Sequence, residues 1–139
     1  MSTPRIAFVC VQNAGRSQMS TALAERERER RDVDVEIVTG GTDPADKVHP
    51  EVVEVMRELD VDLSDRSPRK IAAEDLEACD YVITMGCSAG DVCPAGYGGE
   101  VRDWDLQDPH GQDPDTVREI RNDIRERIQR LFDELEEKQ

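Results

Sequence analysis

Short apolar runs alternate with longer amphipathic segments along this chain. The runs Arg5–Cys10 and Tyr81–Met85 are almost continuously apolar, and Val33–Thr39 is rich in β-branched residues before Gly40-Gly41. Runs of this kind are typical of strands that are buried on both faces of a parallel sheet. Val101–Trp104 is a fourth candidate. The pattern therefore predicts four strands, the second of which ends at the two glycines.

Helical spacing marks the segments between and after these strands. We expect helices at Arg16–Arg31, Pro50–Leu59 and Ile71–Ala78, and a last helix that begins at Asp113-Pro114. One apolar stripe follows the last helix for about six turns, and its members are Val117, Ile120, Ile124, Ile128, Leu131 and Leu135. Because strands alternate with helices, the sequence predicts an α/β fold of three layers, a four-stranded parallel sheet with helices on both faces.

The length of 139 residues limits the domain organisation. This length is typical of one domain, and no linker or repeat interrupts the pattern, so we expect a single domain over residues 1–139. No apolar stretch approaches the roughly 20 residues of a membrane span. The first residues do not resemble a signal peptide. We therefore expect a cytoplasmic protein that does not bind a membrane.

The charge is strongly unbalanced, with 32 Asp and Glu against 18 Lys and Arg, a formal net charge of −14. Nucleic-acid binding needs a basic surface, so no nucleic-acid partner is expected. Such an acidic composition, with few lysines, suits a protein that stays soluble in concentrated salt. A halophilic source is our prediction, and an ordinary acidic cytosolic protein is the alternative.

Four cysteines are too few for a secreted disulfide scaffold, and they favour thiol chemistry in the cytosol. No Cys-x2-Cys spacing occurs, and His49 and His110 form no cluster with the cysteines in the sequence. We expect no metal site and no bound cofactor. Cys79 is expected in the core. The cysteines are Cys10, Cys79, Cys87 and Cys93.

The octet Cys10-Val11-Gln12-Asn13-Ala14-Gly15-Arg16-Ser17 joins the first strand to the first helix. The N–H groups and the positive dipole end of this helix face back toward the octet, which makes an anion site. Gly15 lets the backbone curl, and Arg16 can hold two oxyanion oxygens. These surroundings favour a nucleophilic thiolate at Cys10. By residue type, Ser17 can donate to the thiolate and Asn13 can hold the loop. The predicted oxyanion-binding residues are Val11, Gln12, Asn13, Ala14, Gly15 and Arg16.

With the following Gln18-Met19, the octet resembles the low-molecular-weight tyrosine phosphatase superfamily. Within it, the chain is similar to arsenate reductases that recycle through thioredoxin or a low-molecular-weight thiol. The resemblance covers essentially the whole chain, including Tyr81–Met85, the cysteines at 87 and 93, and the segment Trp104–Pro109. Arg16-Ser17-Gln18-Met19 and the Cys87/Cys93 pair resemble the reductase branch.

This resemblance implies reduction of arsenate, with Cys10 as nucleophile and Asp108 as the general acid; phosphate would fit the same loop. Turn formation explains all three Asp-Pro steps of the chain, so only the resemblance singles out Asp108. Cys87 is the candidate to attack the Cys10 sulfur, and Cys93 would then attack Cys87. An external thioredoxin-like or low-molecular-weight thiol would reduce the product. In an alternative scheme an external thiol attacks the Cys10 adduct, and the pair takes no part.

Two other functions stay open. A phosphatase would use the same loop to form a phosphocysteine, but a pocket for the phosphotyrosine ring requires aromatic side chains as its walls. We expect at least two of the aromatic residues in the core. The chain has only five Phe, Tyr and Trp residues, which are Phe8, Tyr81, Tyr97, Trp104 and Phe132. The third possibility is a non-catalytic oxyanion-binding or redox-sensing module, which would bind arsenate or phosphate without turnover.

Overall fold

A computed structural model describes residues 3–86 and 97–137. Its strands are β1 (Arg5–Cys10), β2 (Glu36–Gly41), β3 (Tyr81–Met85) and β4 (Glu100–Asp103). They form one sheet in the order β2-β1-β3-β4, and every neighbouring pair is parallel. The predicted four-stranded parallel sheet is therefore confirmed.

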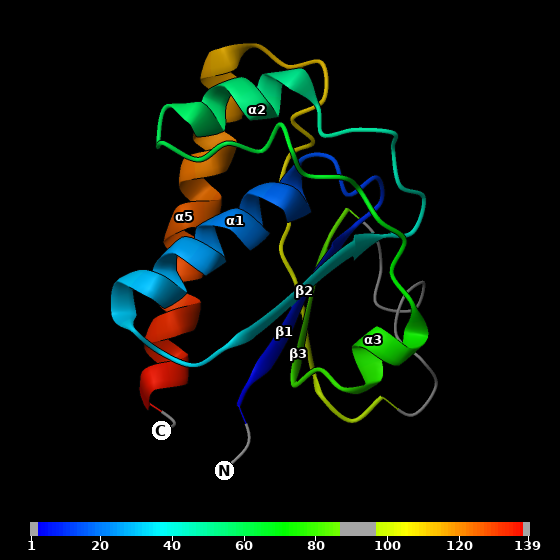
Figure 1. The fold of residues 1–139 in the computed structure, drawn as a ribbon, viewed down its shortest axis with the longest axis vertical. Coiled ribbons are helices and arrows are strands. Elements are labelled where there is room, and N and C mark those ends of the chain that lie inside the picture. Colours follow the sequence, from blue (N-terminus) through cyan, green and yellow to red (C-terminus); the bar gives the residue numbers. More distant parts are fainter. Residues whose placement is uncertain (1–2, 87–96, 138–139) are drawn as a thin grey trace.

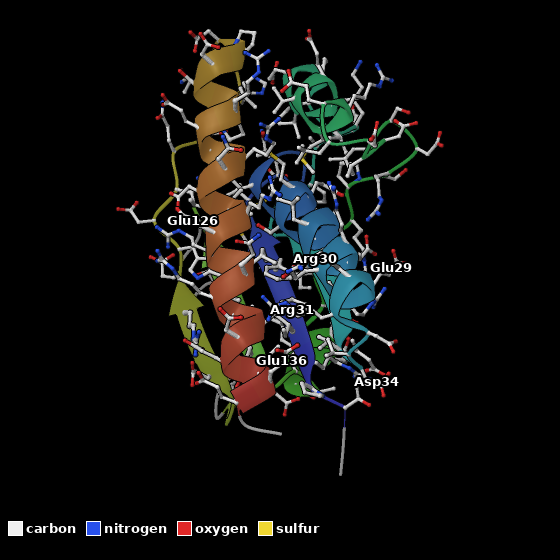
Figure 2. All side chains as sticks on the ribbon, turned by 90° about the vertical axis from the view of Figure 1, so that its left-hand side faces the viewer. Glu29, Arg30, Arg31, Asp34, Glu126 and Glu136 are labelled. Carbon is white, nitrogen blue, oxygen red and sulfur yellow. The ribbon has the colours of Figure 1, made fainter. Side chains whose placement is uncertain are left out.

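Helices cover both faces of this sheet, as predicted. The helices α1 (Arg16–Arg31), α2 (Pro50–Arg57) and α5 (Pro114–Glu137) lie on one side, and the short α3 (Ala73–Glu77) lies on the other (Figure 1). Arg31, at the end of α1, forms ion pairs with Asp133 and Glu136 of α5; Figure 2 labels Arg31 and Glu136. The two long helices are thus tied together at their carboxyl ends.

The alternation of side chains along β1 divides the core into two parts. Ile6, Phe8 and Cys10 belong to the larger cluster under α1 and α5, whereas Ala7 and Val9 belong to the smaller cluster on the α3 side. Because helices cover both faces of the sheet, the side chains of β1 are buried whichever face they point to, and none of these positions has to be polar. This explains the continuous apolar run in the sequence. The stripe predicted for α5 is buried at all six positions.

The second strand differs from its predicted boundaries. Asp32 adopts a left-handed conformation (φ 52°) that ends α1, and the N–H of Val33 still bonds to the Arg28 carbonyl. The strand therefore starts only at Glu36. It also continues through Gly40 and Gly41 instead of stopping before them, because Gly41 pairs with Cys10. Glycine is required at position 41, since an added Cβ there would collide with the Val11 carbonyl.

Two helices are shorter than predicted, and α5 begins at the predicted position. The helix α2 ends at Arg57 rather than Leu59, and α3 has only five residues. The structure agrees with the predictions for β1, α1 and β3 to the residue. In the described part of the chain, no helix has the length and apolar character needed to cross a membrane.

Candidate active site

The site lies at the carboxyl edge of the sheet, where β1 ends and α1 begins. Cys10 is the last residue of β1, pairs with Gly41 and Met85 on the two flanking strands, and is buried. Ligand sites of open α/β sheets lie beyond this edge. A hollow of about 340 Å³ opens here, lined by Cys10, Val11, Gln12, Gly15, Arg16, His49, Gly86, Asp108 and His110.

The carbonyl groups of the loop are bonded on its outer side. Four of them accept backbone N–H groups from the segment 42–49: Cys10 from Thr42 (3.2 Å), Val11 from Asp43 (2.8 Å), Gln12 from Ala45 (2.9 Å) and Ala14 from His49 (2.9 Å). A planar trans peptide places each carbonyl opposite the following N–H. The N–H groups of residues 11, 12, 13 and 15 therefore face away from that segment. Such a concave set of donors is an arrangement that binds anions.

Asn13 holds this loop in shape. It is fully buried and left-handed (φ 51°), a conformation that Asn tolerates better than most residues. Its Oδ1 accepts the N–H of Arg69 at 3.0 Å, which fixes the orientation of the amide. Its Nδ2 then donates to Ser17 Oγ (2.7 Å) and Thr39 Oγ1 (2.9 Å). Gln18 Nε2 donates to the Asn13 carbonyl and Oδ1, both at 3.1 Å.

The sulfur of Cys10 lies among hydrogen-bond donors. The N–H of Asn13 donates to Sγ at 3.2 Å, and Ser17 Oγ is 2.8 Å from the same atom. Because Ser17 Oγ already accepts from the Asn13 amide, its own proton is available to the sulfur. Neither a side-chain cap nor an acidic residue occupies the first turn of α1, so nothing there offsets the positive end of the helix dipole. These surroundings suit a thiolate.

Arg16 enters the same hollow from the first position of α1. Its Nη1 donates to the Leu106 carbonyl at 3.1 Å, and its Nη2 lies 4.0 Å from Asp108 Oδ2. The backbone of Gly86 (φ +81°) lies against the guanidinium, since an added Cβ would be 2.6 Å from Nη2. The Asp108 side chain is 58% exposed, and its Oδ1 accepts the N–H of His110 at 3.0 Å. The structure thus brings together four predicted residues: Cys10, Arg16, Ser17 and Asp108.

Two residues of this hollow, His49 and His110, were missed by the sequence analysis. The buried His49 places Nε2 3.0 Å from Gln12 Oε1, and the two imidazole rings meet edge to face with centroids 4.2 Å apart. Burial lowers the pKa of His49, as does the nearby His110, while Glu51 and Asp108 oppose the shift. Among the described residues, the two histidines contact each other and line the same hollow as Cys10. Their separation of 61 residues left no local sequence signal.

Of the other three cysteines, only Cys79 lies in the described part of the chain. Cys87 and Cys93 fall outside the described residues, so their predicted relay stays a prediction. Gly86, which precedes Cys87 in the sequence, lines the hollow. Cys79 is buried in the smaller core cluster, as expected, and burial raises the pKa of its thiol to about 11. A larger hollow of about 880 Å³ borders Cys79, but it lies where the strands begin, at the edge opposite Cys10.

Known proteins resemble this chain over nearly all of its length. A protein of Halobacterium salinarum named "Putative arsenate reductase" is 61% identical over 136 residues, 96% of this chain and 94% of the relative. The halophilic source predicted from the composition fits this relative. A glutaredoxin arsenate reductase of Synechocystis is 28% identical over 92% of this chain and 95% of its own.

Structural similarity leads to the same group of proteins. A thioredoxin-dependent arsenate reductase of Corynebacterium glutamicum matches with a TM-score of 0.80 at 39% identity, over 99% of this chain and 64% of that longer chain. The model of the family described as low molecular weight phosphotyrosine protein phosphatase matches residues 5–139. The loop, the fold and these matches agree, and the chain belongs to the low molecular weight phosphotyrosine protein phosphatase family.

Proposed function

We propose that this protein reduces arsenate to arsenite, with the thiolate of Cys10 as the nucleophile. The observation that carries the proposal is the Cys10 sulfur itself, which lies among the donors of Asn13 and Ser17 at the base of a loop whose N–H groups face inward. Arg16 adds a cation to the same hollow. The 61% identical relative, named as an arsenate reductase, supports this reaction over others of the family.

In the first step, the inward N–H groups of residues 11–15 and the Arg16 guanidinium hold the arsenate oxygens. The Cys10 thiolate attacks arsenic, and a sulfur–arsenic bond forms. The bond from arsenic to one hydroxyl oxygen breaks, and this oxygen leaves as water with a proton from the carboxyl group of Asp108, which lies beside Arg16 at the rim. Ser17 and Asn13 keep the sulfur oriented before the attack.

In the second step, the thiolate of Cys87 attacks the sulfur of Cys10. A disulfide forms, the sulfur–arsenic bond breaks, and its electron pair stays on arsenic, which leaves as arsenite. Cys93 then attacks Cys87, which releases the Cys10 thiolate and leaves a Cys87–Cys93 disulfide. The two electrons thus come from two thiols, and an external dithiol must return them.

The external reductant is a thiol protein or a small thiol, and we propose a thioredoxin-like protein. The thioredoxin-dependent structure at 39% identity supports this assignment, while the Synechocystis relative is named for glutaredoxin. Because the cycle needs reduced cysteines, the protein would work in the cytoplasm.

A phosphatase reaction is the second candidate, because a phosphate ester would meet the same loop, thiolate and Asp108. One observation favours the reductase. All five Phe, Tyr and Trp residues of the chain lie in the described part, and none of them lines the hollow. A phosphotyrosine ring would find no aromatic wall there among the described residues. We therefore expect phosphotyrosine to be a poor substrate.

The test is a single-turnover reaction of fully reduced protein with arsenate, without any added reductant. We expect about one arsenite per protein, because the two electrons come from one pair of thiols. A peptide map would contain a Cys87–Cys93 disulfide. Thioredoxin with its reductase, compared with glutathione and glutaredoxin, then identifies the reductant that supports repeated turnover.

Matched cysteine variants separate the alternatives. Cys10→Ser should give no arsenite, and Cys87→Ser should stop before arsenite is released. Cys79→Ser is the control, since Cys79 lies in the core beyond the site, and it should behave as the parent. Arsenite formation by Cys87→Ser only after glutathione is added would replace the relay with the external-thiol scheme. If the protein cleaves a phosphoester but forms no arsenite even when thiols are added, its function is that of a phosphatase.

A further inference from the structure

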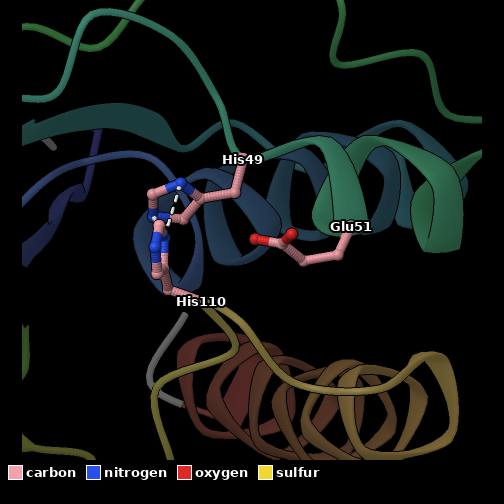
Figure 3. A group of neighbouring side chains, drawn as sticks. All are labelled: His49, Glu51 and His110. Atoms are coloured by element: carbon pink, nitrogen blue, oxygen red, sulfur yellow. Dashed lines mark hydrogen bonds between the residues drawn. The ribbon is translucent and has the colours of Figure 1, made fainter.

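A second group of side chains with metal-ligand chemistry lies at the rim of the hollow. His49 precedes α2, Glu51 lies in the first turn of α2, and His110 comes from the segment before α5. One potential ligand atom from each residue lies within 4.8 Å of the other two. Figure 3 shows the two rings side by side, with the Glu51 carboxylate directed toward them.

The two rings are joined by a hydrogen bond, which Figure 3 marks. His110 Nδ1 lies 3.1 Å from His49 Nδ1 and 3.2 Å from His49 Nε2. Because His110 Nδ1 is nearly equidistant from both nitrogens of His49, this bond is shared between them and is not aligned with the lone pair of either nitrogen. An ion that binds both imidazoles would replace this shared hydrogen bond.

The tautomer of His49 suits metal binding. Gln12 Oε1, an acceptor, lies 3.0 Å from His49 Nε2, so this nitrogen carries the ring hydrogen. The lone pair is then on Nδ1, the nitrogen 3.1 Å from His110 Nδ1. Metal-binding histidines commonly donate their other N–H to an oxygen acceptor in this way, which fixes both tautomer and ring orientation.

The spacing suits a tetrahedral ion. With metal–nitrogen bonds of about 2.0–2.1 Å, two ligands of a tetrahedral zinc ion lie roughly 3.3 Å apart, and the two Nδ1 atoms are 3.1 Å apart. His110 is exposed and Glu51 is half-exposed, so a ring rotation and a small movement of the carboxylate can complete the site. Two imidazoles and one carboxylate favour zinc and its neighbours in the transition series over magnesium or calcium.

We propose that His49 Nδ1, His110 Nδ1 and the Glu51 carboxylate bind one Zn²⁺-class ion at the rim of the Cys10 hollow. Three protein ligands leave a fourth position for water. His49 and His110 themselves line the hollow, so the ion would lie next to the oxyanion loop. None of its three ligands has a role in the proposed arsenate chemistry, so binding of the ion can be tested without arsenate.

Cobalt is the probe that distinguishes this site from the four thiols. The full-length reduced protein is titrated with Co²⁺, and Zn²⁺ is then added as a competitor. We expect one equivalent of Co²⁺ to bind with visible d–d absorption and without the near-ultraviolet charge-transfer band of a cobalt–thiolate bond. Zn²⁺ should displace it. No arsenate is present, so the result does not depend on the proposed function.

Three variants complete the test. His110→Ala and Glu51→Gln should each weaken Co²⁺ binding by at least about tenfold, whereas Glu54→Gln, an equal charge change at an exposed position of α2, should bind as the parent does. Metal-free His110→Ala should melt with the parent, since His110 is exposed. A charge-transfer band at the first equivalent, or undiminished binding by His110→Ala, would overturn the proposal.

Discussion

The guanidinium of Arg16 is positioned mainly by backbone groups. Its firm contacts are the Leu106 carbonyl at 3.1 Å and the backbone of Gly86, against which it lies. The Asp108 carboxylate is 4.0 Å away and more than half exposed, so this ion pair contributes little. The space beside Gly86 therefore decides where the guanidinium points.

Gly86→Ala should displace Arg16 and weaken oxyanion binding. The added Cβ would come within 2.6–2.8 Å of three guanidinium atoms. We expect the KM for arsenate to rise about tenfold, which is equivalent to roughly 1.4 kcal/mol, and steady-state kinetics would measure it.

Gly111→Ala is the matched control for this substitution. Gly111 also has a positive φ (+76°), but an added Cβ would meet nothing within 4 Å. Both variants should lose about 1–2 kcal/mol of stability through the left-handed backbone. Only the Gly86 variant should lose arsenate affinity, and an equal rise of KM in the two would show that backbone strain, not the contact with Arg16, is responsible.

At the scale of residues, the sequence could predict those parts of the site whose residues are adjacent in the chain. The octet from Cys10 to Ser17 carries its chemistry in neighbouring positions, so strand, loop and helix could be recognised together. His49 and His110 could not be paired in this way, since 61 residues separate them. The contact of Gly86 with Arg16 likewise depends on two distant strand ends that only the folded sheet brings together.

At the scale of elements, a carboxylate joins α2 to α5. Glu58, which follows α2, accepts hydrogen bonds from Arg118 Nε (2.9 Å) and Arg121 Nη1 (2.8 Å). Arg121 is buried and also donates to the Val55 carbonyl. The bonds from Arg118 and Arg121 lower the pKa of Glu58 to about 2. This ion-pair network fixes α2, and with it the His49 end of the site, onto the long helix.

Glu58→Gln should lower stability at neutral pH but not in acid. Because the folded pKa of about 2 lies below the ordinary value of 4.5, the carboxylate stabilises the fold fully above pH 4.5. This stabilisation is lost as the pH falls from 4.5 toward 2. Urea unfolding at several pH values should show the two proteins converging over this window, and a constant difference would contradict the assignment.

The boundaries of the elements were predictable where local signals were strong. The helix α1 begins after Gly15 and ends in an arginine-rich last turn, and both ends matched. The second strand was displaced because Asp32 and Val33 are used to end α1, and because Gly41 pairs within the sheet. A glycine pair normally indicates a turn, but here the missing side chain makes room for the oxyanion loop.

At the scale of the whole molecule, the net charge of −14 is the dominant feature. Some of the charge is matched locally, as where Glu27 accepts from Arg30 and Arg31 on α1, but 14 negative charges remain in excess. Self-repulsion of this kind destabilises a compact state unless salt screens it. The screening length falls from about 10 Å at 0.1 M salt to about 3 Å at 1 M.

The fold should therefore be more stable in concentrated salt. We expect the melting temperature to rise by about 5 °C or more between 0.1 M and 2 M KCl, the equivalent of roughly 1 kcal/mol or more for a domain of this size. Circular dichroism at 222 nm would follow the transition. KCl is chosen because sulfate stabilises most proteins by exclusion from the surface. An unchanged melting temperature would refute the role of self-repulsion.

The outer strand β4 has a consequence for behaviour in such salt. An edge strand presents unpaired backbone groups that can recruit a strand from a second molecule. In molar salt, repulsion between acidic molecules reaches only about 3 Å and no longer keeps them apart. The edge itself must then prevent sheets from joining, and it is short and charged: Arg102 pairs with Glu100 and Glu134 along a strand that ends at Asp103. Any partner strand at this edge would have to strip water from these groups, so in molar salt the four residues of β4, and not the net charge, protect this edge of the sheet.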